Sequence, residues 1–138
     1  MTGPRTLGLF GSAPLPPETL QRLSPAALAY LGDAVFELYI RTYYLLPPQR
    51  LGAYHQRVVD QVRAETQAGL LETLTPHLTQ SEQDWVRRGR NQAAKGPRRL
   101  SGSLYQQATG LETLLGYLYL QNPQRLRELL GRLALPDC

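Results

Sequence analysis

The segment Leu28–Ile40, LAYLGDAVFELYI, decides the fold, because it combines the apolar spacing of a helix with a carboxylate in its middle. At about 100° per residue, one stripe of this helix is apolar. That stripe is predicted to face the core and consists of Leu28, Leu31, Val35, Leu38 and Leu45. Asp33 falls roughly opposite, beside Ala29, Phe36, Glu37 and Ile40. A solvated face seldom carries Phe36 and Ile40 together, so a second helix or a second subunit is expected to cover this side as well.

Helix start and stop signals surround this segment. Ser24 is a typical N-cap, and Pro25 suits the first helical position. The helix is expected to end before Pro47, which cannot continue it. Helical spacing resumes at residue 51 and runs to about residue 74, with Gly69 as a possible break.

The second half of the chain carries similar signals. Thr79 and Glu82 form a capping-box pattern, as do Ser103 and Gln106, and a short amphipathic helix follows Pro123. No segment shows the sustained two-residue alternation of a β-strand. The predicted fold class is therefore all-α, a helical bundle.

Length, charge and cysteine content narrow the class of protein. A chain of 138 residues fits one domain, here residues 18–138 after a flexible leader at 1–17. The net charge of +4 and the pI of about 9.5 suit a polyanionic partner. The single cysteine, Cys138, fits a reducing cytoplasm. No apolar run reaches the roughly 18 residues of a membrane span, so no membrane partner is expected.

The segment from Tyr105 to Leu120 repeats the pattern of an acid within an apolar helix. Its core stripe is predicted to consist of Leu104, Ala108, Leu111, Leu115 and Leu118. Glu112 lies beside that stripe, next to the small residues Thr109 and Gly116. Small residues allow another helix to approach Glu112 closely.

Two such helices could bring Asp33 and Glu112 together. Two close carboxylates repel, so one must take up a proton unless a cation lies between them. Oxygen ligands alone favour a hard ion such as Mg²⁺ or Mn²⁺. The alternative is that each acid is a surface residue or half of an ion pair with arginine. Spacing does not show whether the two helices touch.

A basic stretch separates the two acidic helices. Between residues 87 and 99 it contains six cations and no acid: Arg87, Arg88, Arg90, Lys95, Arg98 and Arg99. Such a stretch suits contacts with phosphates. It is equally compatible with a solvated helix end, where arginine is favoured by the helix dipole.

The two acidic segments resemble a known family. LAYLGDAVFEL is similar to the signature helix of the ribonuclease III family, a LEFLGDAVL-like run, and ATGLETLLGYLYL is similar to its second acidic motif, a DTVEALIGA-like run. The resemblance spans Ser24 to Leu120. The small size, the RRGRN segment and the absence of a following double-stranded-RNA-binding domain resemble the Mini-ribonuclease III branch of that family.

The resemblance implies a fold and an activity. It implies a homodimeric, Mg²⁺-dependent endoribonuclease that cuts double-stranded RNA, with the signature helices near the dimer interface. For this branch it implies maturation of the large-subunit (23S) ribosomal RNA precursor in the bacterial cytoplasm. Asp33 and Glu112 fall on the family's metal-ligand positions and are the expected catalytic residues.

Two acids of the family pattern are missing from this sequence. Ala29 and Thr109 stand where the wider family has a Glu and an Asp, as in the Mini-ribonuclease III branch. Waters, RNA phosphates or Glu37 would then complete the ligand shell. Glu37 is expected to support the site or to lie at the subunit interface, with direct ligation as the alternative.

The resemblance also favours RNA contact for the basic stretch. Arg90, Asn91 and Lys95 are the first candidates, followed by Arg88. His55 is either a core or interface histidine or a residue near the RNA backbone, and no second histidine or cysteine is spaced to make it a metal ligand.

Two rival functions remain compatible with the sequence. The first is a non-catalytic double-stranded-RNA-binding factor for ribosome assembly on the same scaffold, which the loss of two acids favours. Cleavage of duplex RNA with Mg²⁺, compared with EDTA, distinguishes it from an enzyme. The second is a helix-turn-helix DNA binder, which is disfavoured because the basic residues cluster in a loop. Competition between duplex DNA and duplex RNA tests it.

Overall fold

The computed structural model describes residues 14–95 and 102–137, and within these ranges every regular element is a helix. The elements are α1 (Pro17–Arg22), α2 (Pro25–Tyr43), α3 (Leu51–Val62), α4 (Ala64–Leu74), the 3-10 turn η2 (Thr75–His77), α5 (Gln80–Ala94), α6 (Ser103–Gln121) and α7 (Pro123–Gly131). The predicted all-α class is confirmed. Residues 1–13 of the expected leader lie outside the described ranges, so the proposed boundary at residue 17 stays a prediction.

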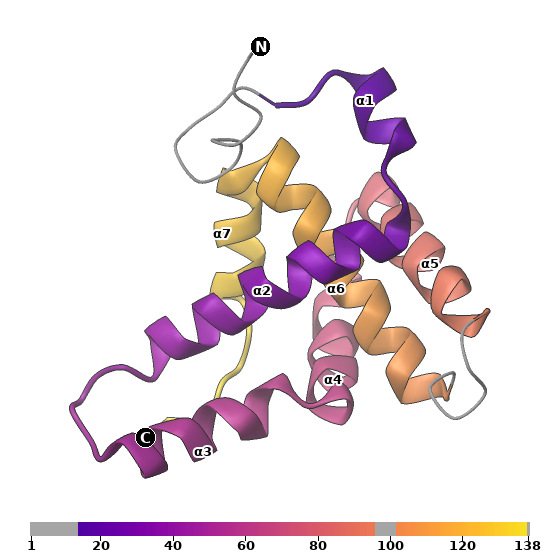
Figure 1. The fold of residues 1–138 in the computed structure, drawn as a ribbon. Coiled ribbons are helices and arrows are strands. Elements are labelled where there is room, and N and C mark those ends of the chain that lie inside the picture. The colour runs from indigo at the N-terminus through magenta and orange to yellow at the C-terminus, as the bar shows by residue number, and fades with distance from the viewer. Residues whose placement is uncertain (1–13, 96–101, 138) are drawn as a thin grey trace.

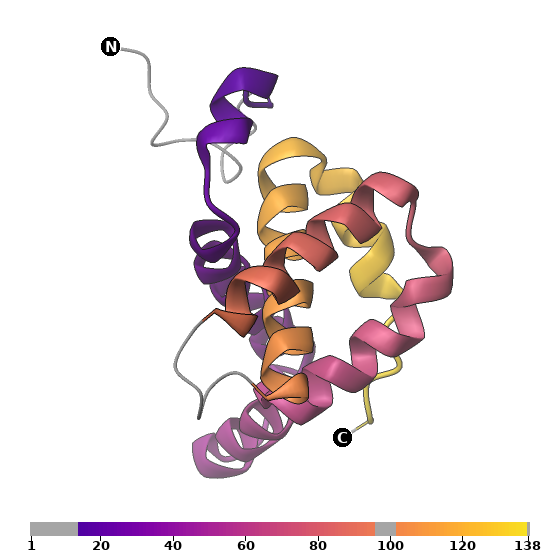
Figure 2. The same cartoon turned by 90° about the vertical axis from the view of Figure 1, so that its right-hand side faces the viewer.

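Helix α6 is the centre of the bundle. It packs against α2, α5, α4 and α7. Figure 1 shows α2 crossing α6 on one side, and Figure 2 shows α5 along another side. Because α6 contacts helices from both halves of the chain, its side chains are among the most completely buried, including Leu111, Leu114 and Leu115.

The face of α2 that enters the core differs from the predicted stripe. Leu28 is buried as expected, but Leu38 is 63% exposed. Leu45 lies beyond the end of α2 at Tyr43 and is 54% exposed. Phe36 and Ile40, on the side that a second helix or subunit is expected to cover, are completely buried within this chain. The side of α2 that packs is set by where its backbone meets α6, as described below, and not by its widest run of leucines. In α6, Leu104 is also exposed, because it lies in the first turn of the helix.

Two of the three predicted N-caps are present in the structure, and the third is not. The Ser24 hydroxyl accepts a hydrogen bond from the Ala27 amide at 3.0 Å. Thr79 and Glu82 form the predicted capping box. Ser103, however, is the first residue of α6, whose N-cap is Gly102 without a side-chain hydrogen bond.

The break after α3 also falls at a different residue from the one expected. It lies at Arg63, whose extended backbone (φ −68°, ψ 150°) separates α3 from α4. Gly69 lies inside α4 and does not interrupt it. Glycine permits a helix break but does not impose one, so the presence of Gly69 did not predict the position of the break.

A buried ion pair ties α7 to the start of α5. The Arg125 guanidinium donates from Nε to Glu82 Oε2 at 2.8 Å and from a terminal nitrogen to Glu82 Oε1 at 3.0 Å. It also donates to the carbonyl of His77 at 2.7 Å. The hydrogen bond from Arg125 is the main reason that the pKa of Glu82 is lowered, although the side chain is buried. Glu82 thus caps α5 and holds α7 in place at once.

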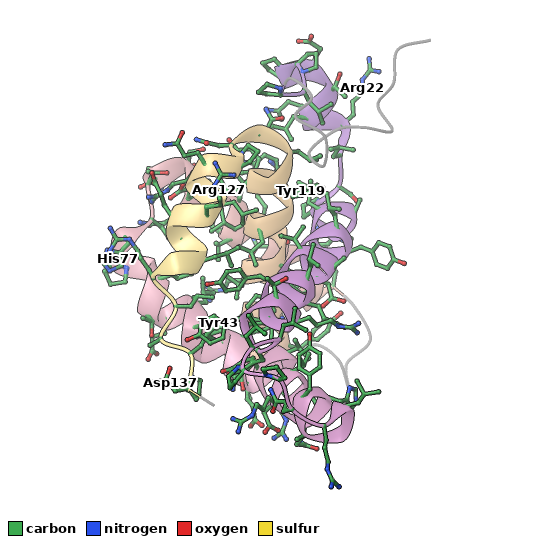
Figure 3. The ribbon with its side chains drawn as sticks, turned by 90° about the vertical axis from the view of Figure 1, so that its left-hand side faces the viewer. Arg22, Tyr43, His77, Tyr119, Arg127 and Asp137 are labelled. Atoms are coloured by element: carbon green, nitrogen blue, oxygen red, sulfur yellow. The ribbon has the colours of Figure 1, made fainter. Side chains whose placement is uncertain are left out.

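Both ends of the described chain form hydrogen bonds to the helical bundle. The Leu15 amide donates to the side-chain oxygen of Gln121 at 2.8 Å. The C-terminal segment returns to the end of α2, where the Tyr44 hydroxyl donates to the Pro136 carbonyl at 2.6 Å; Figure 3 labels the neighbouring residues Tyr43 and Asp137 in this region. Within the described residues, no helix combines the length and the apolar character needed to span a bilayer.

Candidate metal site between α2 and α6

Two glycines bring α2 and α6 into backbone contact. A methyl group placed on Gly32 would lie 1.7 Å from the carbonyl oxygen of Glu112. One placed on Gly116 would lie 2.0 Å from the carbonyl oxygen of Leu28. Any side chain at either position would push the helices apart. The sequence indicated close approach at Gly116, whereas the matching role of Gly32 was missed, although it precedes Asp33 directly.

This crossing brings the two predicted acids together. Asp33 of α2 and Glu112 of α6 line one pocket of about 240 Å³, and their carboxyl groups are within hydrogen-bonding reach. The pocket is completed by Ala26, Ala29, Tyr30, Tyr105 and Thr109. Ala29 and Thr109, the positions where the family pattern has further acids, therefore belong to the same pocket. They supply small neutral walls instead of carboxylates.

The electrostatics of the pair favour either a proton or a cation. Burial, followed by the hydrogen bond and the negative charge of Asp33, raises the pKa of Glu112 from its ordinary value of 4.5 to about 8. A cation between the two carboxylates would replace the shared proton, since it removes their repulsion. The donor set consists of carboxylate oxygens, which suits a hard divalent ion such as Mg²⁺. No cluster of three or more acidic, histidine or cysteine side chains is placed to hold a metal in the described ranges.

One residue of the site was not found from the sequence. Gln67 of α4 is only 2% exposed, and its amide nitrogen lies 3.4 Å from Oε2 of Glu112. It shares the inward face of α4 with Leu70, Leu71 and Leu74. A polar side chain at a core position of an amphipathic helix is the signal that could have revealed it.

Glu37 lies one helical turn from Asp33. Both residues line a second, larger pocket of about 440 Å³ with Tyr30, Ala34, Leu38 and Arg41. The Glu37 carboxylate forms an ion pair with Arg41, four residues later in the same helix. Its charge is thus already compensated.

His55 lies on the surface of α3. It lines a shallow pocket of about 100 Å³ with Arg41, Leu51, Tyr54 and Val58. Because His55 is exposed, its interpretation as a core histidine is wrong. Arg41 lines both this pocket and the one that contains Asp33, so the two pockets adjoin.

The predicted RNA-binding residues of α5 differ in their surroundings. The Arg88 guanidinium lies 4.2 Å from the ring centre of Trp85, which itself stacks on Tyr117. Arg90, Asn91 and Lys95 are exposed at the C-terminal end of α5. Arg98 and Arg99 lie outside the described residues.

The chain is similar to proteins of known family over most of its length. The model of the Ribonuclease III domain matches residues 26–123. The chain is 64% identical over 118 residues to Mini-ribonuclease 3 from a Synechocystis species, covering 86% of this chain and 82% of that protein. It is 55% identical over 134 residues to Mini-ribonuclease 3 from a Synechococcus species, covering 97% of both.

A solved structure agrees with this assignment. A crystal structure of a Fusobacterium nucleatum protein superposes with a TM-score of 0.72 at 27% sequence identity, covering 81% of this chain and 92% of that one. The matched family model runs from the second residue of α2 through the end of α6, and this range includes both acidic segments. The chain belongs to the ribonuclease III family, in its Mini-ribonuclease 3 branch, and is an endoribonuclease.

Proposed function

We propose that this endoribonuclease cleaves double-stranded RNA with the help of a divalent cation, Mg²⁺ or Mn²⁺, held by Asp33 and Glu112. The observation that carries this proposal is the meeting of these two carboxylates in one pocket, 79 positions apart in the sequence, at a glycine-mediated helix crossing. We also propose precursor 23S ribosomal RNA as the natural substrate, processed in the cytoplasm. The similarity to Mini-ribonuclease 3 proteins supports this choice.

Asp33 and Glu112 have complementary roles in this proposal. Asp33 is exposed and can reach a phosphate group in solution, whereas Glu112 is half-buried and anchored in α6. A divalent cation bound there would supply activation of a water molecule and neutralisation of charge on the phosphate. Ala29 and Thr109 leave space in the pocket, so water and RNA phosphate oxygens are expected to provide the remaining ligands.

Arg90, Asn91 and Lys95 are proposed to contact the RNA backbone, with Arg88 and His55 as further candidates. Arg90 and Lys95 have no ion-pair partner within the described ranges, so their charges are available to phosphates. Duplex RNA is recognised mainly through its shape, its phosphates and its 2′-hydroxyls, and the Asn91 amide can both donate to and accept from a hydroxyl. Arg88 is held over Trp85 and would reach RNA only from that position.

A homodimer is part of the proposal. Tyr30 and Leu38 project from α2 beside Asp33 and are 86% and 63% exposed. A second copy packed on this face would remove both side chains from water. Such packing would also place Glu37, which lines the same pocket, at the subunit interface. Two chains would also place two basic helix ends on one duplex, which raises the effective affinity.

Cleavage of an RNA duplex in Mg²⁺, compared with EDTA, tests the proposal directly. Asp33→Asn and Glu112→Gln keep the size of the side chain and remove its charge, so both variants are expected to bind RNA and fail to cut it. Sequencing of RNA ends after treatment of precursor ribosomal RNA tests the substrate. Binding without cleavage by the unmodified chain, in Mg²⁺ and in Mn²⁺, would instead support a non-catalytic assembly factor.

A further inference from the structure

Gln67 places a buried amide against the carboxylate of Glu112. The Gln67 side chain is almost completely enclosed, among the leucines on the inward face of α4. Burying an amide in apolar surroundings is unfavourable unless it forms hydrogen bonds. Its nitrogen donates to Glu112 Oε2, 45 residues away in the sequence. The amide is thus located where a leucine would pack more favourably, and its nitrogen is directed at the carboxylate of Glu112.

Three helices therefore converge on the site. Asp33 comes from α2, Glu112 from α6 and Gln67 from α4, and both α2 and α4 pack on α6. The neutral residues Ala29 and Thr109 replace two acids of the family pattern, so fewer side chains restrain the pair. We propose that Gln67 is a positioning residue, which holds one oxygen of the Glu112 carboxylate and thereby orients this group for the cation shared with Asp33. This inference rests on the metal site proposed above.

The chemistry of an amide suits this role. It donates a hydrogen bond without adding a charge of its own, so it orients the Glu112 carboxylate without competing for the cation. A third carboxylate at this position would add repulsion, and an apolar side chain would leave the buried carboxylate oxygen without its donor. Partners that orient metal ligands typically change metal affinity by about 10- to 100-fold when they are removed.

Titration of the whole chain with Mn²⁺, followed by the electron paramagnetic resonance signal of the free ion, tests this role without RNA. Gln67→Met keeps the length of the side chain and removes the donor, and it is expected to weaken Mn²⁺ binding by about tenfold. High Mn²⁺ concentration is expected to restore its cleavage of duplex RNA, whereas Asp33→Asn should stay inactive at any concentration. Restoration by metal separates positioning from loss of structure.

Thr113→Val is the matched control. Thr113 is completely buried, adjoins Glu112 in the sequence, and donates to the carbonyl of Thr109 at 2.7 Å. It is expected to lower stability and leave Mn²⁺ affinity within about twofold, because its hydroxyl bonds to backbone carbonyls and not to the pair. If circular dichroism shows that Gln67→Met does not fold, Gln67→Asn carries the same test, since its amide is one methylene too short to reach Glu112.

The outcomes separate this inference from the proposed function. Wild-type affinity for Mn²⁺ in a folded Gln67 variant would overturn the positioning role while the metal site stands. Equal loss of affinity in Thr113→Val would also overturn it, because the effect would then follow core stability. If the wild-type chain binds no Mn²⁺, or if Asp33→Asn binds it equally well, the metal site itself falls.

Discussion

Replacement of Gly32 by alanine should separate the two helices that carry the acidic pair. The added methyl group would lie 1.7 Å from the Glu112 carbonyl oxygen and 2.9 Å from the Gly116 nitrogen. Ordinary contacts begin at 3.4 Å, so the two backbones must move apart by up to 1.7 Å. Both obstructing atoms belong to a helix backbone, which cannot rotate away as a side chain would.

This displacement has a cost in stability and in activity. Overpacking of a well-packed core typically costs about 1–3 kcal/mol, and a backbone clash belongs at the upper end of this range. We therefore expect Gly32→Ala to lower the free energy of unfolding by about 3 kcal/mol. A misplacement of about 1 Å at a reacting centre can cost about 100-fold in rate, so cleavage by the remaining folded protein should fall by about that factor.

Urea unfolding followed by circular dichroism and single-turnover cleavage of an RNA duplex measure these two effects. Gly69→Ala is the control, because Gly69 lies inside α4 with no atom within 4 Å of an added methyl group. It should stabilise the chain by about 0.4–1 kcal/mol by restricting the unfolded state, with cleavage unchanged. Near-wild-type stability and cleavage in Gly32→Ala would refute the backbone contact between α2 and α6.

Three other perturbations test separate parts of the account. In EDTA, the folded chain should keep a proton on Glu112 up to about pH 8, whereas the unfolded chain releases this proton near the ordinary pKa of 4.5. The free energy of unfolding should therefore fall as the pH rises from 4.5 to about 8 and level off above that. Glu112 should contribute at most about 1.4 kcal/mol per pH unit to the slope of the free energy of unfolding against pH, and this contribution should be absent in Glu112→Gln. Urea unfolding that gives the same slope in both chains would contradict the raised pKa. Arg125→Met leaves Glu82 buried without its partner and should cost about 3 kcal/mol in thermal or urea unfolding, whereas the exposed Arg127→Met on the same helix should cost under about 0.5 kcal/mol. Equal effects at the two arginines would show that the ion pair contributes little. Arg90→Gln and Lys95→Gln should each weaken RNA binding and reduce the salt dependence of the binding constant by about one unit of log–log slope, measured by fluorescence anisotropy at several salt concentrations. An unchanged slope would remove these residues from the RNA contact surface.

Local signals in the sequence predicted the starts of α2 and α5 correctly, but not the N-cap of α6. Ser24 and Thr79 cap their helices because the partner amide lies three residues away and no distant contact competes. Contacts between segments that are distant in the sequence were harder to predict. Leu38 was placed in the core because periodicity ranks side chains by apolar character, whereas the packed face of α2 is set by Gly32 against the backbone of α6.

The same distinction applies to the site. Spacing identified Asp33 and Glu112 as unusual acids but left open whether their helices touch, and the family resemblance supplied their pairing. Gln67 could not be identified from the sequence because its role depends on a hydrogen bond to Glu112, 45 residues away. Tertiary contact of this kind cannot be inferred from the periodicity of a single helix.

The most direct test of the central claim is the anomalous diffraction signal of crystals grown with Mn²⁺. The account predicts an ion in contact with the carboxylates of both Asp33 and Glu112, and loss of that ion in Glu112→Gln crystals treated identically. Crystals with no ion at this pocket at saturating Mn²⁺, or with an ion held by neither acid, would contradict the claim that the two residues form one metal site.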